Sequence, residues 1–174
     1  MRVRAATLDD LREMDALRRA NQEAVGFIPL SKYEQVLNRL IVAEDGGDLT
    51  GFLYWTAGTP LASIQQVAVR EDARRAERAS LLVAAAISQA QKLGRFGMTC
   101  RCRLSLEATE FWPALGFIAV RQEQSGRRGP LVRFAKLFSP SLLSLGDFVR
   151  GPHPGKLIFQ HRGFRLLTRE GPPA

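Results

Sequence analysis

The chain is poor in residues that hold metals and disulfides. Its 174 residues include two cysteines, Cys100 and Cys102, and two histidines, His153 and His161. Secreted domains stapled by disulfides need more cysteines, so we expect a reducing, cytoplasmic setting. Cysteines one residue apart on a strand point the same way, which suits small core residues better than a zinc site lacking two ligands. We therefore expect no bound metal.

Long hydrophobic runs are also missing. The longest uninterrupted apolar stretch, residues 81–87, is too short to cross a bilayer. The first six residues are not followed by an apolar signal region. An apolar content of 45% and an aromatic content of 8% are typical of a globular soluble protein. The length suits one domain with a core and an appendage, with no membrane partner.

Negative charge is scarce in the last third of the chain. Residues 1–120 carry 15 Lys/Arg and 14 Asp/Glu, whereas residues 121–174 carry 10 Lys/Arg and 3 Asp/Glu. A folded basic surface would attract a polyanion such as nucleic acid. A solvated basic tail without a partner explains the same counts. In a third interpretation, the apolar segments 157–159 and 164–167 seal a hydrophobic edge or form a homodimer contact.

The most informative stretch is a strand, a charged turn and a helix between residues 62 and 93. Residues 64–69 alternate roughly between apolar and polar and end in valines, which predicts a strand. Residues 79–93 are rich in Ala, Leu and Gln and are followed by Gly94, which predicts a helix with a glycine stop. The free N–H groups and the dipole of such a helix start can hold an anion. Most strand-turn-helix units nevertheless bind nothing.

The spacing in this turn resembles the acyl-CoA pyrophosphate loop of the GNAT superfamily of N-acyltransferases. The family's loop has Arg or Gln, two residues, Gly, one residue, and Gly or Ala. Arg74 and Ala79 match this pattern, and Glu77 stands where the family has its first Gly. The glutamate adds a side chain and a negative charge at a close backbone approach. Arg75 and Arg78 could offset that charge.

The remaining pattern predicts further helices and strands in the GNAT order over residues 1–138, with a basic extension at 139–174. Two other segments resemble the family, residues 108–117 (ATEFWPALGF) and the hairpin at residues 42–53. The predicted strands are 1–6, 40–44, 49–55, 98–104, 117–121 and 131–138, with a tail hairpin at 157–159 and 164–167. The predicted helices run from a capping box at Thr7 to about residue 24, from a cap at Ser31 to Leu40, and from Ser105 to Trp112.

The resemblance implies an α/β (α+β) fold, with a mixed, mostly antiparallel sheet flanked by helices. It also implies that acyl-CoA lies between the two central strands, and that an acetyl or related acyl group passes directly from acetyl-CoA to a primary amine of an unspecified acceptor. The implied cofactor-binding residues are Val67, Ala68 and Val69 for the pantetheine, and Arg74, Arg75, Ala76, Glu77, Arg78, Ala79 and Ser80 for the pyrophosphate.

Side chains for acid–base chemistry are few. Trp112 stands where the family often has a Tyr acid, and no Asp or Glu lies on residues 64–69. Glu44 is a candidate base, although a hairpin carboxylate is more often only solvated. Cys102 and Ser105 are candidate proton donors near the leaving thiolate. Two alternatives stay open: a binding module that kept the fold without activity, and a GNAT protein acting on nucleic acid or aminoacyl-tRNA.

Overall fold

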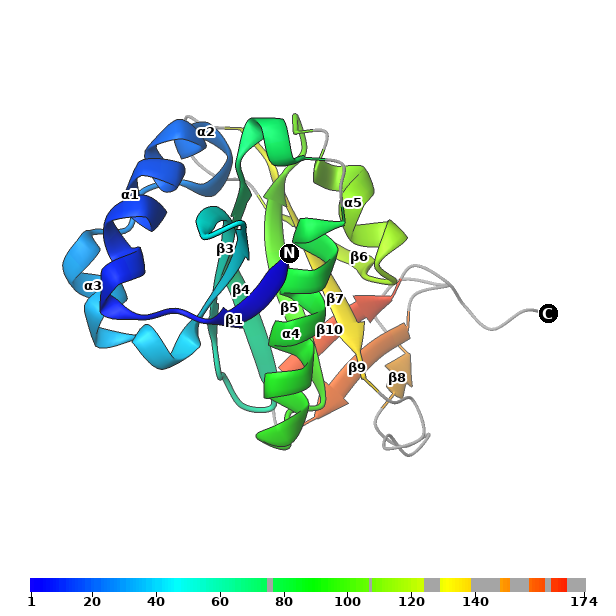
Figure 1. The fold of residues 1–174 in the computed structure, drawn as a ribbon. Helices are drawn as coiled ribbons and strands as arrows, with labels where there is room; N and C mark the ends of the chain where they lie inside the picture. Colours follow the sequence, from blue (N-terminus) through cyan, green and yellow to red (C-terminus); the bar gives the residue numbers. More distant parts are fainter. Residues whose placement is uncertain are drawn as a thin grey trace. The chain divides into compact units, whose positions relative to one another are not determined.

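The computed structural model describes residues 1–74, 77–106, 108–123, 129–138, 148–150, 157–161 and 164–168 (Figure 1). The chain divides into two compact units. The first comprises residues 1–57 and 63–93, and the second comprises residues 58–62 and 94–174. Among the predicted loop and tail residues, Arg75, Ala76 and residues 124–128, 139–147, 151–156, 162–163 and 169–174 lie outside the described parts of the chain.

Seven strands form one sheet in the order β1-β2-β3-β4-β5-β7-β6. The pairs β1/β2, β2/β3, β3/β4, β5/β7 and β6/β7 are antiparallel. This confirms the predicted mixed α/β class with a mostly antiparallel sheet. The strands are β1 (Arg2–Ala5), β2 (Leu40–Asp45), β3 (Asp48–Thr56), β4 (Leu61–Val69), β5 (Gly97–Arg103), β6 (Ile118–Glu123) and β7 (Leu131–Leu137).

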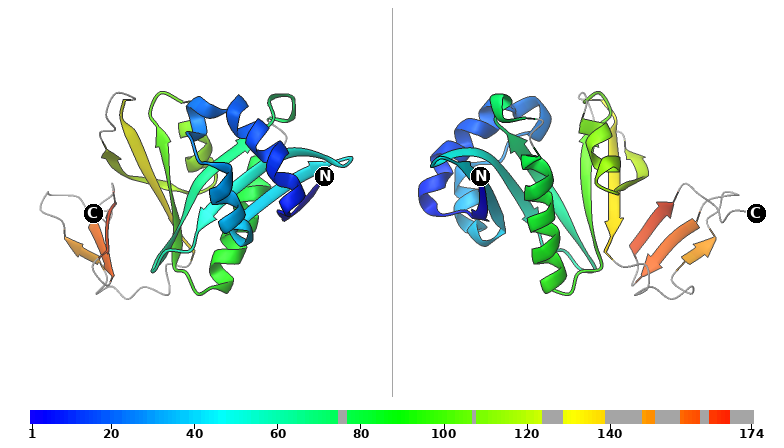
Figure 2. Two further views of the ribbon diagram at one scale, coloured as in Figure 1. Left: turned by 90° about the vertical axis from the view of Figure 1, so that its left-hand side faces the viewer. Right: turned by 45° about the vertical axis from the view of Figure 1, so that its right-hand side comes forward.

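In the first unit, helices cover both faces of the sheet formed by β1, β2, β3 and residues 63–69 of β4. The helix α4 (Arg78–Lys92) runs along one face, and α1 (Leu11–Ala20) and α3 (Leu30–Gln35) lie on the other (Figure 2). Successive side chains of a strand point to opposite faces. Accordingly Phe52 of β3 packs in the cluster under α1 and α3, whereas Gly51 faces Leu82 of α4.

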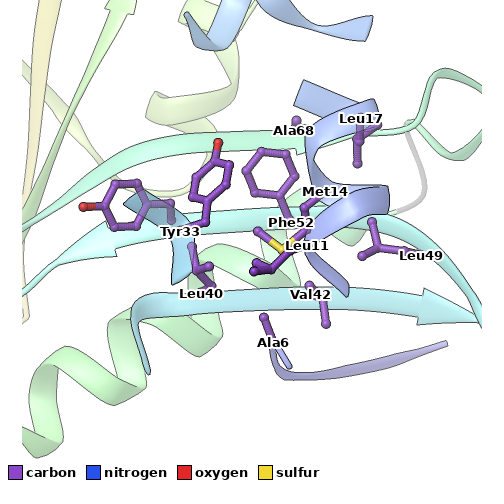
Figure 3. Packing of buried hydrophobic residues seen from close by; sticks show 11 residues of the cluster. Ala6, Leu11, Met14, Leu17, Tyr33, Leu40, Val42, Leu49, Phe52 and Ala68 are labelled. Atoms are coloured by element: carbon purple, nitrogen blue, oxygen red, sulfur yellow. The ribbon is translucent and has the colours of Figure 1, made fainter. Parts of the chain in front are cut away.

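The core under α1 and α3 is built from one stripe of each helix and alternate residues of the strands. Leu11, Met14 and Leu17 of α1 recur at helical spacing and are buried against the sheet (Figure 3). Tyr33 of α3 meets Phe52 edge to face, with ring centroids 6.1 Å apart. The stripe therefore fixes which face of α1 meets the sheet, as its periodicity predicted.

The first helical segment begins as predicted and is then broken. The backbone N–H of Thr7 donates to the Asp10 carboxylate at 2.6 Å, as the predicted capping box requires. The expected single helix to residue 24 is wrong, because a 3₁₀ turn (Leu8–Asp10) precedes α1 and the helix is interrupted at Asn21 before α2 (Gln22–Val25). The Asn21 side chain donates to the carbonyl of Leu17 at 2.9 Å, which ends α1.

Asp10 also anchors the first strand. The two Nη groups of Arg4 donate to its two oxygens at 2.7 and 2.8 Å, and hydrogen bonding from Arg4 lowers the pKa of Asp10 to about 2. A carboxylate whose folded pKa lies below its unfolded value stabilises the fold above the unfolded pKa and loses this effect as pH falls through the folded pKa.

Asp10→Asn is therefore expected to lower the free energy of unfolding by about 2 kcal/mol at neutral pH. The difference from the wild type should shrink as pH falls from about 4 to about 2, where the wild-type carboxylate becomes protonated. Denaturant unfolding at both ends of that range measures the effect. The control variant Asp9→Asn changes an exposed neighbouring carboxylate and should alter the free energy of unfolding little at any pH. An equal loss of stability in both variants would contradict the assigned ion pair.

Two other predicted helices have different bounds. The second helix begins after Pro29 and ends at Gln35, so Ser31 lies inside it instead of capping it, and a separate 3₁₀ turn (Leu37–Arg39) leads into β2. The helix α5 (Ala108–Ala114) starts three residues after Ser105 and continues through Pro113. Proline near the end of a seven-residue helix removes only one backbone donor from the few hydrogen bonds that the helix can form.

The second unit contains β5, β7, β6 and α5, with a further small sheet. Leu61, Val120 and Ala135 form its described hydrophobic cluster. Strands β8 (Phe148–Arg150), β9 (Leu157–His161) and β10 (Phe164–Thr168) pair in the order β10-β9-β8. The antiparallel β9/β10 pair confirms the predicted tail hairpin, whereas β8 was not predicted.

Candidate functional site

The strongest candidate site lies where β4 turns into α4. The backbone N–H of Arg70 donates to the carbonyl of Thr50 at 2.8 Å, which holds the chain against β3 as β4 ends. A 3₁₀ turn (Glu71–Ala73) follows, and α4 begins at Arg78. The helix has 15 residues, so its first turn presents free N–H groups and the positive end of a substantial dipole. The predicted strand-turn-helix layout is confirmed.

Glu77 is the N-cap residue of α4 and has a left-handed backbone. Its φ is 57° and its ψ is −2°, and it is the single non-glycine residue with positive φ in the described part of the chain. Glycine adopts this conformation without the steric penalty that a Cβ brings. The backbone therefore has the shape that the family's glycine would favour, while an exposed glutamate side chain stands there.

We expect Glu77→Gly to tighten acetyl-CoA binding several-fold, because it removes a carboxylate from the loop expected to bind the pyrophosphate and lets the backbone approach more closely. Relief of the left-handed strain, about 1 kcal/mol, should offset the flexibility cost of glycine and leave stability unchanged or raised. Titration calorimetry and thermal melting measure the two effects. Glu71→Gly makes the same charge change outside the left-handed region; an equal gain there, or weaker binding in Glu77→Gly, would contradict the assignment.

The arginines of the turn have different partners. Arg74 is exposed and donates to the neutral side-chain amide of Asn21 at 2.8 Å. Arg78 pairs with the carboxylate of Asp45 at 2.9 Å and donates to the carbonyl of Ala73 at 3.1 Å. The Asp45 carboxylate compensates the positive charge of Arg78, whereas the partner of Arg74 is a neutral amide that leaves its charge uncompensated. Arg74 is thus the better placed of the two to meet an anion.

The other residues predicted for the loop take simple positions. Ala79 and Ser80 occupy the first turn of α4, both half-buried. Arg75 and Ala76 lie outside the described residues, so their part in the loop stays a prediction.

The strand β4 carries a bulge beside the segment predicted to bind pantetheine. Val67, Ala68 and Val69 pair with Leu53, Phe52 and Gly51 of β3. The register then shifts: Gln66 faces Tyr54 and Ile64 faces Trp55, so Gln65 is the extra residue. Bulges are over-represented next to active sites, because they re-aim backbone and side chains.

The sequence did not predict a buried hydrogen-bonded pair on the same strand, formed by Gln66 and Tyr33. The Tyr33 hydroxyl donates to Oε1 of Gln66, and Nε2 of Gln66 donates to the carbonyl of Val25 at 3.0 Å. Burial raises the pKa of Tyr33 to about 12, so the phenol stays protonated at neutral pH. The sequence offered one clue: a glutamine at a position of the strand where a core residue would be apolar.

The candidate acid–base residues have different surroundings. Glu44 of β2 accepts from Nε of Arg4 at 2.7 Å and lies 3.8 Å from a guanidinium nitrogen of Arg2, the contacts of a structural ion pair. Cys102 of β5 is buried, and burial raises the pKa of its thiol. Ser105 is exposed in the turn after β5. The geometry does not single out any of the three as catalytic.

Trp112 has the contacts of a packing residue. It is buried in α5, with its ring edge to face against Phe111 and Phe117 at centroid distances of 5.0 and 5.3 Å. An indole N–H is a donor only, so it cannot exchange protons as a tyrosine acid would.

Neither a metal cluster nor a membrane helix stands out in the described ranges. Those residues contain no group of three or more His, Cys, Asp or Glu arranged to hold a metal ion. The helices in the same ranges are too short or too polar to cross a membrane. Cys100 and Cys102 are buried free thiols, in keeping with the core role predicted for them.

Comparisons with known proteins agree with this fold. The structure is similar to Ard1 from Thermoplasma volcanium, with 16% identity, coverage of 78% of this chain and 96% of that one, and a TM-score of 0.70. A Mycobacterium tuberculosis protein solved in complex with CoA matches at 15% identity, with 80% and 100% coverage and a TM-score of 0.69. Ribosomal-protein-alanine N-acetyltransferase from Brucella melitensis matches at 20% identity, with 79% and 100% coverage and a TM-score of 0.67.

A search of curated proteins found no match. The model of the acetyltransferase (GNAT) family, by contrast, matches residues 7–117, which include β4, the charged turn and α4. The matched segment is most of the chain and holds the loop with the family's spacing. The chain therefore belongs to the GNAT acetyltransferase family.

Proposed function

We propose that this protein is an N-acyltransferase that moves an acetyl or related acyl group from acyl-CoA to a primary amine. The observation that carries the proposal is the start of α4: free N–H groups, a left-handed N-cap and Arg74 stand at the position of the family's pyrophosphate loop. The Mycobacterium tuberculosis neighbour, solved with CoA, supports the same kind of ligand.

In this proposal the two parts of CoA bind to consecutive segments. The pantetheine binds along the backbone of Val67–Val69, and the pyrophosphate binds the first turn of α4 with Arg74, on the loop of residues 74–80. The bulge at Gln65 ends the regular pairing just before the pantetheine segment. The same backbone thus aligns the donor and anchors its charged end.

The reaction itself is direct transfer. A neutral amine attacks the thioester carbonyl, a C–N bond forms, the C–S bond breaks, and the amine loses one proton while the leaving thiolate gains one. Holding the two reactants together supplies much of the rate enhancement, and a positioned backbone N–H stabilises the oxyanion. Cys102 and Ser105 remain proposed proton donors and Glu44 a proposed base.

Thiol release from acetyl-CoA tests the proposal. The full chain is incubated with acetyl-CoA and a panel of primary amines, amino acids and peptides, and free CoA is measured with a thiol reagent. We expect amine-dependent release that stops when the acceptor is omitted. Saturable acetyl-CoA binding without release from any acceptor would instead favour the alternative, a binding module that kept the fold.

The basic residues 121–174 motivate a proposed second partner, a nucleic acid or aminoacyl-tRNA. Ten Lys/Arg against three Asp/Glu is the supporting observation. Counterion release makes such binding fall steeply as salt rises from about 50 to about 200 mM. A gel-shift assay over that salt range tests nucleic-acid binding. If the basic segment instead forms a homodimer contact, nucleic acid should stay unbound even at low salt, and light scattering should give twice the mass of one chain. We place these activities in the cytoplasm, given the scarcity of cysteine.

A further inference from the structure

Arg18 of α1 has a buried guanidinium that is only partly paired. The residue is 3% exposed. Its Nε and Nη2 donate to the same oxygen of Asp15 at 3.0 and 2.8 Å, whereas its buried Nη1 has no hydrogen-bond partner among the described residues. A buried N–H of a charged group is costly to leave unpaired, so an unpaired one needs an explanation.

An aromatic ring covers this guanidinium. Phe27 places its ring centroid 5.0 Å from Cζ of Arg18, yet 70% of Phe27 is exposed. Gly26, directly before it, has a φ of 74°, and a Cβ built there would meet no heavy atom within 4 Å. A cation–π contact at an exposed site is weak. The exposed side chain of Phe27 is outside the core, so a movement of this ring away from the guanidinium is the route to Nη1 that we consider below.

The segment that carries this cover is tied to β4. Nε2 of Gln66 donates to the carbonyls of Val25 and Gly26 at 3.0 and 3.4 Å, and Tyr33 donates to the same glutamine. Gln66 lies next to Val67, the start of the strand segment proposed to hold the pantetheine. The segment that carries the Phe27 ring over Arg18 is thus hydrogen-bonded to the strand proposed to align the donor.

The local charge favours an anion. Asp15 is shared, because Arg19 also pairs with it at 2.7 Å, so one carboxylate faces two guanidiniums. A guanidinium with an open N–H matches a carboxylate oxygen in geometry and charge. A polycationic acceptor would be repelled here.

We propose that Nη1 of Arg18 binds the carboxylate of the acceptor, which is therefore a small amine carrying a carboxylate, such as a free amino acid. Phe27 moves off Arg18 when the acceptor enters. This assignment deepens the proposed acyltransferase function and rests on it for the identity of the ligand as acceptor.

Guanidinium NMR of the full chain tests the site without acetyl-CoA. The common L-amino acids and their amides are titrated as matched pairs while the Arg18 signals are followed. We expect at least one amino acid to shift these signals saturably, with its amide binding at least about tenfold more weakly. Phe27→Ala should tighten the binding of that amino acid several-fold. Equal shifts from acid and amide, no saturable shift from any acid, or no tightening in Phe27→Ala would overturn the proposal.

A second measurement separates this site from the proposed function. Acetyl transfer is compared for the same acid and amide in wild type, Arg18→Gln and Arg18→Lys, with Arg12→Gln as the control, since Arg12 is an exposed arginine of the same helix. We expect the acid-over-amide ratio of kcat/KM to fall at least about tenfold in Arg18→Gln, to be partly kept in Arg18→Lys and to stay unchanged in Arg12→Gln. Acetyl-CoA affinity should not change in any variant.

The outcomes are distinguishable. An acid-selective NMR shift without any transfer would overturn the proposed acyltransferase function and the acceptor assignment but keep the carboxylate site. Transfer without acid selectivity, or the same loss in Arg12→Gln, would overturn the site and keep the acyltransferase. Thermal melting identifies a variant that fails to fold, and Phe27→Ala, which alters an exposed side chain, then decides between the outcomes.

Discussion

Leu82→Ala is expected to lower the free energy of unfolding by about 2–5 kcal/mol, the range for removing a large aliphatic side chain from a packed core. Leu82 is fully buried in the first half of α4, and its Cδ1 would lie 3.2 Å from a Cβ placed on Gly51 of β3. This contact seats the helix on the sheet one turn beyond the proposed pyrophosphate site. Denaturant unfolding measures the loss.

The adjacent residue provides a matched control. Leu81 is 40% exposed, so Leu81→Ala should change stability by less than about 1 kcal/mol. The two variants remove the same atoms from neighbouring positions of one helix. Similar costs for both would mean that α4 does not pack on β3 with the face described here.

Ala79→Asp is expected to weaken acetyl-CoA binding by at least about tenfold while leaving the fold as stable as the wild type. The new carboxylate lies in the first turn of α4, where a negative charge interacts favourably with the helix dipole. The same charge repels a pyrophosphate and crowds its approach to the backbone. Binding and stability should therefore move independently, and calorimetry and thermal melting measure them.

The loop arginine gives a second route to the same effect. Arg74→Glu should also weaken acetyl-CoA binding, because it reverses the charge of a side chain whose partner is the neutral amide of Asn21. Lys92→Glu, at the other end of α4, makes the same change in net charge and should leave affinity nearly unchanged. Equal losses in both would indicate a general charge effect and remove Arg74 from the site.

Much of the fold could be predicted from the sequence where the pattern was strong. The stripe of Leu11, Met14 and Leu17, the hairpin turn with its two glycines and the glycine stop after α4 each have one local cause. Gly46, Gly47 and Gly94 adopt the positive φ that their turns require.

The errors have a common origin in side-chain contacts that no local pattern encodes. The end of α1 depends on one side-chain hydrogen bond from Asn21. The helix α5 continues through Pro113 because a proline near the end of a seven-residue helix removes only one backbone donor, and the packing of Trp112 against Phe117 accompanies it. Such contacts override local preference, which is why helix bounds were less accurate than the existence of the helices.

The sequence suggested the proposed anion site but gave no sign of the proposed acceptor site. The spacing of Arg74 and Ala79 pointed to the turn before α4, where a helix start and an arginine offer the donors that an anion site uses. The ring of Phe27 lies over Arg18, and Gln66 of β4 hydrogen-bonds to the carbonyl of the neighbouring Gly26. The contact with β4 joins residues far apart in the sequence, so only the tertiary structure shows it.

Hydrogen–deuterium exchange of the full chain with and without acetyl-CoA tests the central claim most directly, that the start of α4 holds the pyrophosphate. The N–H of Leu81 already donates to the carbonyl of Glu77 at 3.0 Å, so the free N–H groups of the first turn are those of residues 78–80. These should gain a hydrogen-bond partner, and their exchange should slow at saturating acetyl-CoA. The backbone of Val67–Val69 should slow as well. If saturating acetyl-CoA leaves the exchange of residues 78–80 unchanged, whether or not other segments become protected, the account is contradicted.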